Sequence, residues 1–345
     1  MWDRQATGTF IGCGADYGEC AVALFGAPFD GTASYRQGAR FAPAAVRSES
    51  YSIETYSPYQ NIDLADVGSG AHDAGGKNNN GRACVGSGVR DAGGKNINGR
   101  ACVGGGVHDT SMKNMNGRAC VGGGVHDAGD LELPYGNTAR ALNMIENYTA
   151  RVINDGKTPF MIGGEHLVTL GAARAAAKAC PDMAIVQFDA HADLRDEFLG
   201  EELSHACVMR RCWDLLGDGR IYQFAVRSGE RAEFAFAEEH TRMRRFGFNG
   251  LSEAIDSINL DMPGRPVYLT IDMDALDPSE LPGTGTPEAG GARFNELLEA
   301  AIETIKKCNV IGLDITELCP PSDPGGISVP LACKLIRELL ITILS

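Results

Sequence analysis

The sequence predicts an α/β fold of three layers, in which helices cover both faces of a mainly parallel central sheet. Short apolar runs alternate along the chain with longer stretches of helical periodicity, and strands that alternate with helices form parallel sheets. The apolar runs are continuous, as is typical of strands that are buried on both faces. The length of 345 residues allows two domains or one large α/β domain, and we expect one.

The apolar runs predict six strands, in chain order 20–25, 160–162, 183–188, 221–225, 267–271 and 310–313. A first helix is expected to open at Pro43, because proline suits the first turn of a helix. Amphipathic patterns predict four further helices, at 138–154, 166–179, 295–307 and 328–344. In parallel sheets the ligand binds beyond the carboxyl ends of the strands, so we expect the functional residues there.

The composition excludes several classes of protein. The net charge is -14, and the phosphates of a nucleic acid require a basic face. No apolar run approaches the roughly 18 to 20 residues that span a membrane. The first residues, MWDRQATGTF, lack a basic start followed by an apolar stretch. We therefore expect a cytoplasmic protein with neither a nucleic-acid nor a membrane partner, whose 11 cysteines are reduced thiols.

An internal repeat interrupts this pattern. Three copies of 18 residues occupy 67–84, 85–102 and 103–120, and a partial fourth copy runs from Val121 to Gly129. A calcium-binding nonapeptide roll is excluded, because Val107 replaces a glycine that its motif requires. Glycine, asparagine and small residues offer little to bury. We therefore predict that residues 67–129 form a flexible surface excursion, inserted into a single domain that spans residues 1–345.

Three of the predicted strands lead directly into acidic residues and histidines. Side chains alternate between the faces of an extended chain, so residues two apart project to the same side. The candidate residues are Asp189, His191 and Asp193 after strand 183–188, Asp272 and Asp274 after strand 267–271, and His166 after Gly163-Gly164-Glu165. The two glycines permit a tight turn that presents His166 at the end of its strand. Four carboxylates and two imidazoles are thus expected at one edge of the sheet.

These six side chains favour a centre of two metal ions. Four carboxylates in a dry site repel one another and have raised pKa values, and divalent cations remove this conflict. Six ligands are too many for one tetrahedral zinc ion, but they suit two metals that share bridging carboxylates. A set rich in oxygen favours Mn²⁺ or another hard ion over Zn²⁺.

Several motifs resemble those of the ureohydrolases, and most closely those of the agmatinases. The motifs are GGEH (163–166), DAHADLR (189–195), TIDMDALDP (270–278), GTGTPEAGG (283–291) and DITELCPP (314–321), together with GAPFDGTASYRQGARFAP near the start and LSHACVMRR (203–211). The resemblance covers essentially the whole chain except the repeats. It implies two Mn²⁺ ions per subunit and a homo-oligomer, commonly a trimer or hexamer.

The resemblance also implies a role for each site residue. One Mn²⁺ would be held by His166, Asp189, Asp193 and Asp272, and the other by His191, Asp189, Asp272 and Asp274. Asp189 and Asp272 would then bridge the two ions. His205 would transfer a proton, and Glu317 would receive the guanidinium group.

An agmatinase hydrolyses agmatine to putrescine and urea, a step of polyamine synthesis. A protonated guanidinium is a poor electrophile, and two Mn²⁺ ions would supply hydroxide by lowering the pKa of a bridging water. Glu317 would orient the planar group with paired hydrogen bonds. The amine leaves only after protonation, and histidine titrates in a suitable range to provide that proton.

Two alternatives remain open at the level of the sequence. Arginases typically carry Arg-Asp-Val-Asp, where an acid meets the α-amino group of arginine, but this chain has Arg227-Ser228-Gly229. That difference favours agmatine, although arginine, guanidinobutyrate or a related linear guanidino compound stays possible. The other alternative is a non-catalytic binding protein in which the repeats are the working part, and the six complete ligand positions argue against it.

Overall fold

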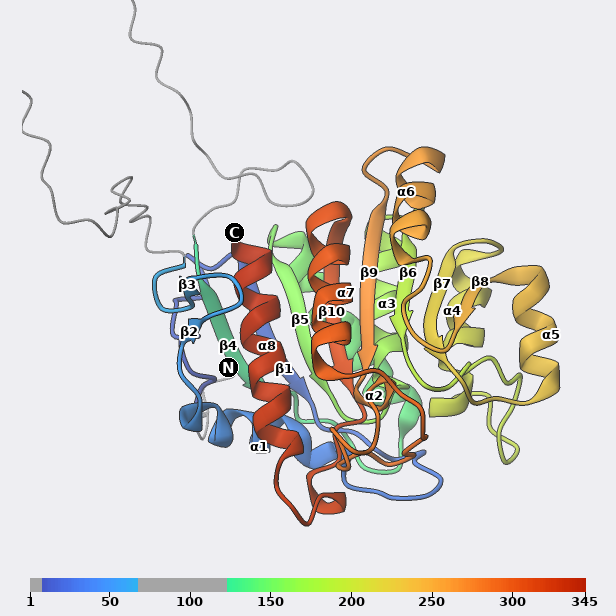
Figure 1. Cartoon of the computed structure of the whole chain (residues 1–345), viewed down its shortest axis with the longest axis horizontal. Coiled ribbons are helices and arrows are strands. Elements are labelled where there is room, and N and C mark those ends of the chain that lie inside the picture. Colours follow the sequence, from blue (N-terminus) through green and yellow to red (C-terminus); the bar gives the residue numbers. More distant parts are fainter. Residues whose placement is uncertain (1–7, 68–122) are drawn as a thin grey trace, which may run out of the picture.

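The computed structural model describes residues 8–67 and 123–345 and contains a central sheet of eight strands (Figure 1). The strand order is β4-β1-β5-β10-β9-β6-β7-β8, and every neighbouring pair in this sheet is parallel. Helices cover both faces, so the predicted three-layer α/β fold is confirmed. The predicted repeats 67–120 lie almost wholly outside the described residues.

Six strands match those predicted from the apolar runs. They are β1 (Val22–Ala27), β5 (Thr158–Gly163), β6 (Ala184–Phe188), β7 (Ile221–Val226), β9 (Pro266–Asp272) and β10 (Asn309–Thr316). In β6, Ala184, Val186 and Phe188 enter one hydrophobic core, whereas Ile185 enters the other. A strand that lies between two cores needs apolar side chains on both faces, which explains the continuous apolar runs.

The helices divide between the two cores. The predicted helices are α1 (Ala42–Glu49), α2 (Thr138–Asn154), α3 (Val168–Ala179), α7 (Phe294–Lys307) and α8 (Ser328–Leu344), and the sequence analysis missed α4 (Val208–Leu216), α5 (Arg231–His240) and α6 (Leu251–Asp261). One core contains residues of α1, α6, α7 and α8, and the other contains residues of α2, α3, α4 and α5. The first group therefore covers one face of the sheet and the second group the other face.

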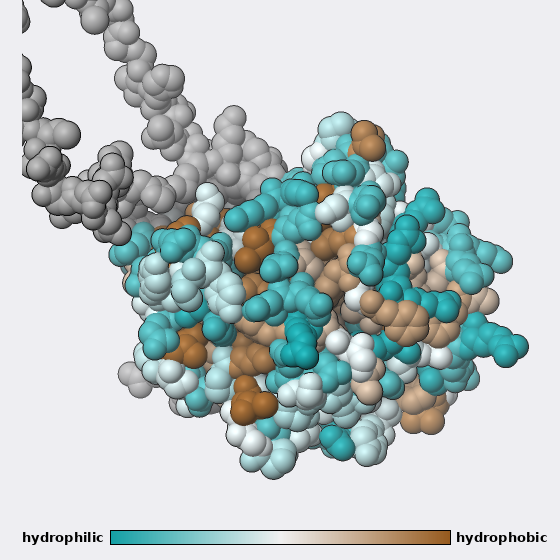
Figure 2. All heavy atoms as spheres, viewed as in Figure 1, coloured by the Kyte–Doolittle hydropathy of each residue, from teal (hydrophilic) through white to brown (hydrophobic). Residues whose placement is uncertain are grey.

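Outside the main sheet, β2 (Tyr56–Ser57) and β3 (Ile62–Asp63) form a small antiparallel pair. Short 3-10 helices occupy Ala39–Phe41, Ser50–Ser52, His205–Cys207, Met273–Ala275 and Pro320–Ser322. The face that carries α7 and α8 is mainly hydrophilic, with smaller hydrophobic patches between the polar groups (Figure 2). Among the described residues, no helix has both the length and the apolar character needed to cross a membrane.

Two strands of the main sheet differ from the sequence prediction. The first, β4 (Val125–Asp130), lies in the fourth repeat copy, so the prediction of a flexible excursion up to Gly129 was wrong at its carboxyl-terminal end. Val125 is buried in the core and pairs with Val22 of β1, which gives the fourth copy a place in the central sheet. The second, β8 (Arg242–Arg245), is an edge strand with the sequence RMRR, and it has no apolar run to reveal it.

Deletion of the three complete repeat copies, residues 67–120, is expected to leave activity and stability nearly intact. The deletion joins Asp66 to Val121 and restores a Val-Gly pair at the position of Val67. The carbonyl oxygen of Val67 lies 3.9 Å from the position of a Cβ atom on Gly124, so the two described ends already meet. Each doubling of a loop costs only about 0.6 kcal/mol.

Urea release and the midpoint of denaturant unfolding would be compared for the full chain, for the deletion of 67–120 and for a graded control that lacks only 85–102. A folded but inactive long deletion, beside an active short one, would show that the repeats contribute to function.

Candidate metal centre and active site

The predicted site residues meet at the carboxyl edge of four adjacent strands, β5, β10, β9 and β6. His166 follows β5, Glu317 follows β10, the acids of TIDMDALDP close β9, and those of DAHADLR follow β6. The carboxyl ends of parallel strands lie at the same edge of a sheet. The structure therefore brings together residues that are up to about 150 positions apart in the chain, such as His166 and Glu317, whose separation is 151.

The first group of potential ligands surrounds Nδ1 of His166. This atom lies 2.9 Å from Oδ2 of Asp189, 3.0 Å from Oδ2 of Asp193 and 3.3 Å from Oδ2 of Asp272. All four residues are buried. Three carboxylate oxygens and one imidazole nitrogen thus converge on one small volume, and three of the four residues have the spacing of a metal-binding group.

The second group lies beside the first and shares Asp189 with it. Nδ1 of His191 is 2.9 Å from Oδ2 of Asp274 and 3.7 Å from Oδ1 of Asp189. Asp189 therefore directs Oδ2 to the first group and Oδ1 to the second. Two overlapping groups with a shared carboxylate are the arrangement that a pair of neighbouring metal ions requires.

The hydrogen bonds of His166 indicate whether a cation fits beside its Nδ1 atom. Nε2 of His166 is 2.9 Å from Oγ1 of Thr270, and the single hydroxyl proton of Thr270 is donated to Asp314 at 2.6 Å. Nε2 therefore carries a proton, and in the neutral imidazole, which is the form that binds a metal, Nδ1 holds a lone pair. Nδ1 is buried without a hydrogen-bond partner and faces three carboxylate oxygens. Such an arrangement is repulsive on its own, and a cation at this point would satisfy it.

The electrostatics of the acids lead to the same conclusion. Burial, followed by the neighbouring charge of Asp189, raises the pKa of Asp193 to about 7. Burial and the charges of Asp274 and Asp189 raise the pKa of Asp272 well above its ordinary value. The side chains around Asp193 and Asp272 do not supply enough positive charge to keep both carboxylates ionised at neutral pH. Bound metal cations would supply that charge.

Glu317 lies at the wall of the same site, in a strained backbone conformation. Its φ is 61°, a region that residues other than glycine adopt rarely and that often marks functional positions. Oε1 accepts a hydrogen bond from the backbone N–H of His166 at 2.7 Å, so the carboxylate points toward the metal ligands. Burial and the nearby carboxylate of Glu165 raise the pKa of Glu317 to about 8.

His205 lies across the pocket, in the 3-10 helix His205–Cys207. Its Nε2 is 3.2 Å from Oγ of Ser34, and its backbone N–H donates to Oγ1 of Thr32 at 3.1 Å. Burial lowers the pKa of His205 to about 4, so the ring is neutral at pH 7. The sequence analysis missed the role of Thr32 and Ser34. The only signal for them was their place in the quoted N-terminal motif.

Members of both groups, namely His166, Asp193, Asp272 and His191, border one cavity of about 280 Å³ together with Glu317 and His205. Its lining includes further polar residues that the sequence analysis did not single out as site residues, namely Ser34, Arg195, Ser228, Glu230, Glu233 and Thr286. Most of these come from loops after β6 and β7 and from the 283–291 motif. The size and the polar lining suit a small, linear, charged molecule.

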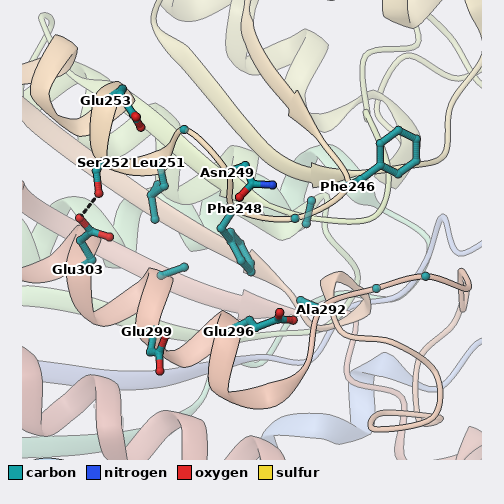
Figure 3. Close-up of a pocket in the computed structure, with 16 residues that line it drawn as sticks. Phe246, Phe248, Asn249, Leu251, Ser252, Glu253, Ala292, Glu296, Glu299 and Glu303 are labelled. Atoms are coloured by element: carbon teal, nitrogen blue, oxygen red, sulfur yellow. Dashed lines mark hydrogen bonds between the residues drawn. The ribbon is translucent and has the colours of Figure 1, made fainter.

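A larger cavity of about 590 Å³ lies between α6 and α7 (Figure 3). Phe246 and Phe248 and four glutamates, Glu253, Glu296, Glu299 and Glu303, line it. It contains none of the predicted site residues and no histidine or cysteine. Because it also contains none of the described groups that could hold a metal ion, we assign the chemistry to the smaller cavity.

Comparisons with known proteins agree with this geometry. A model of the arginase family matches residues 20–84 and 88–342. The agmatinases of Bacillus anthracis and of Bacillus subtilis (strain 168) are each 36% identical to this chain over 333 residues, which cover 96% of it and 95% of each relative. The crystal structure of the agmatine ureohydrolase of Thermoplasma volcanium matches with a TM-score of 0.72 and 29% identity, and covers 96% of this chain and 93% of its own.

Proposed function

The chain belongs to the arginase family, and we propose that it is an agmatinase, which hydrolyses agmatine to putrescine and urea and so supplies polyamine synthesis. The observation that carries the proposal is that members of two overlapping His/Asp groups border one cavity together with Glu317 and His205. The agmatinases that match over nearly the whole chain support agmatine as the substrate. In the reaction, water adds to the guanidinium carbon, the carbon–nitrogen bond to the alkyl chain breaks, and the amine leaves with a proton.

We propose that the site holds two Mn²⁺ ions. The proposed ligands of one ion are His166, Asp189, Asp193 and Asp272, and those of the other are His191, Asp189, Asp272 and Asp274. The unpaired Nδ1 of His166 supports a cation in the first group, and the shared carboxylate of Asp189 supports a second cation beside it. Bound Mn²⁺ ions supply a hydroxide nucleophile at neutral pH and positive charge for the carboxylates.

Glu317 is proposed to bind the guanidinium group. Its Oε1 is held by the N–H of His166, while Oε2 lies 3.4 Å from the position of a Cβ atom on Gly285. A methyl group at Gly285 would therefore be in van der Waals contact with this carboxylate. The guanidinium group is planar and always protonated, and its paired N–H donors match a carboxylate. Its positive charge would offset the burial that raises the pKa of Glu317 to about 8.

His205 is proposed to transfer the proton that the leaving amine needs. Because its pKa is lowered to about 4 by burial, the ring is neutral before the reaction and has to accept a proton first. Addition of water to the guanidinium carbon releases such a proton. The hydroxyl of Ser34, which also lines the cavity, lies next to Nε2. Nε2 is therefore the proposed atom that holds the proton before the amine receives it.

Urea release from agmatine, arginine and guanidinobutyrate, measured side by side with added Mn²⁺, tests the proposal. We expect kcat/KM for agmatine to exceed that for the two carboxylate-bearing compounds. The conservative variant Glu317→Gln serves as the matched control, because it keeps the shape of the side chain but removes the charge that receives the guanidinium. A preference of the wild-type protein for arginine would contradict the agmatinase assignment.

The family resemblance is also the basis for proposing a cytoplasmic homo-oligomer, a trimer or hexamer. Light scattering would measure the mass of this oligomer in solution. In the same way, we propose that the described residues form a single domain that carries the repeats as an insertion.

A further inference from the structure

Glu288 places a carboxylate near the metal ligands that neither of the two groups uses. Its Oε1 accepts a hydrogen bond from Oγ of Ser228 at 3.0 Å and lies 3.9 Å from Nε2 of His191. The side chain is 41% exposed, so it stands between the ligands and solvent. Within the described ranges, no lysine or arginine side chain forms an ion pair with it.

The other acids of this region already have partners. Glu230 and Glu233 pair with the same cation, Arg195, through its Nη1 at 3.1 Å and its Nε at 3.6 Å. Glu233 also accepts a hydrogen bond from the backbone N–H of Leu194 at 2.9 Å. Arg195 is thus shared by two carboxylates, whereas Glu288 has no lysine or arginine partner among the described residues. A ligand that reaches Glu288 would therefore meet a negative wall.

The backbone of Glu288 is fixed although its side chain is accessible. Arg227 donates hydrogen bonds to the carbonyl oxygens of Glu288 at 2.8 Å and Ala289 at 3.1 Å. The same guanidinium donates to the carbonyl oxygen of Asp274 at 2.8 Å. A half-buried arginine that binds several backbone carbonyls holds the loop in one position relative to the candidate metal ligands. The backbone of Glu288 is thus already ordered, so ligand binding would lose little conformational entropy at this residue.

The segment from Gly285 to Glu288 connects the carboxylate of Glu288 to the proposed binding position of the guanidinium group. Gly285 lies beside Oε2 of Glu317, and Glu288 follows three residues later. Three residues of extended chain span at most about 10 Å. Glu288 also contacts Ser228 and His191, which line the same cavity as Glu317. Its carboxylate therefore lies at the margin of the cavity that would hold a linear guanidino amine.

We propose that Glu288 receives the terminal ammonium group of a linear guanidino amine and thereby determines specificity against guanidino acids. This inference rests on the proposed function, because it names the residue that binds the ammonium end of the same substrate. A terminal carboxylate would meet the negative charge of Glu288, whereas an ammonium would form a charged hydrogen bond with it. Ser228 occupies one lone pair of Oε1 and leaves the rest of the carboxylate available.

The variant Glu288→Gln tests the proposal with three substrates, agmatine, n-butylguanidine and 4-guanidinobutyrate. We expect KM for agmatine to rise about tenfold, as for the loss of one partly exposed charged hydrogen bond, with kcat nearly unchanged. KM for n-butylguanidine, which has no ammonium group, should stay the same. The ratio of kcat/KM for 4-guanidinobutyrate to that for agmatine should increase. Glu239→Gln, an exposed acid at the end of α5 whose side chain is 80% exposed, is the matched control for the loss of one charge.

Manganese content and the unfolding midpoint would establish that Glu288→Gln is folded and loaded. If that variant kept the wild-type KM for agmatine, or if Glu230→Gln produced the expected change instead, the inference would be overturned while the proposed function stood. If the wild-type protein released no urea from any guanidine, the proposed function would fail and this inference with it.

Discussion

Replacement of Asp274 by alanine is expected to remove nearly all urea release from agmatine. Oδ2 of Asp274 lies 2.9 Å from Nδ1 of His191, and its Oδ1 accepts a hydrogen bond from the backbone N–H of Ala190 at 3.1 Å. Asp274 is thus fixed in the one position where it can share a cation with His191. Its loss leaves the second group with His191 and the shared carboxylates of Asp189 and Asp272, which already serve the first.

We expect kcat for agmatine to fall by at least about a hundredfold, since that is the usual loss when one charge-stabilising group leaves an active site. Elemental analysis should show that manganese falls from two ions toward one per chain. Asp196→Ala is a matched control, because Asp196 follows the DAHADLR motif and its side chain is 71% exposed. An Asp274→Ala variant that binds two ions and turns over normally would show that the second metal is misassigned.

The sequence could predict which candidate metal ligands lie close together, because their spacing after the strands is regular. Asp189, His191 and Asp193 alternate after one strand, and Asp272 and Asp274 do so after another. The spacing predicts that each set projects to one side by the period of an extended chain, and parallel strands end at one edge. The backbone beyond the strands is not extended, because Met273–Ala275 is a 3-10 helix and Asp193 has a φ of 55°. The structure brings these side chains together, within 4 Å of one another in the pairs that it records. Neither step needs information about distant loops.

The wall of the pocket could not be predicted in the same way. Thr32, Ser228 and Glu288 reach the site from loops, and each position depends on contacts with remote residues, such as the hydrogen bond between Thr32 and Glu165 at 2.6 Å. Loops have no periodicity that fixes the direction of a side chain. The only sequence signal for these residues was that they belong to long motifs. Such a motif marks a segment of the chain but does not show which residues its side chains contact.

The two edge strands of the sheet show a second limit of prediction from the sequence. β8 is short and contains three arginines, because an edge strand needs less apolar surface than a central one. β4 shares the start of its sequence with the earlier repeat copies, and the repeated sequence alone cannot tell which copy pairs with β1. What selects the fourth copy is the chain that follows it. The segment GDLELP replaces GGKNNN-type sequence after Ala128, and the acid Asp130 becomes available to a buried arginine.

That arginine, Arg47 of α1, is the basis of a prediction about stability. Its side chain is 4% exposed. Its Nε donates to Oδ1 and Oδ2 of Asp127 at 3.0 and 2.8 Å, and its Nη1 pairs with Asp130. Asp127 is buried as well, and it also accepts a hydrogen bond from the backbone N–H of Phe10 at 2.8 Å. This ion pair attaches the edge strand β4 to the helix that lies beside it.

The variant Arg47→Met is therefore expected to lower the free energy of unfolding by about 3–5 kcal/mol, the usual cost of leaving a buried charge without its partner. Denaturant unfolding followed by circular dichroism measures this change. The double variant Arg47→Met with Asp127→Asn should recover part of the loss, because the uncompensated charge is removed while an amide oxygen can still accept from Phe10. Arg140→Met, at an exposed position of α2, is the control for loss of an arginine. If Arg47→Met were as stable as that control, β4 would be held by its apolar contacts with β1 rather than by the ion pair.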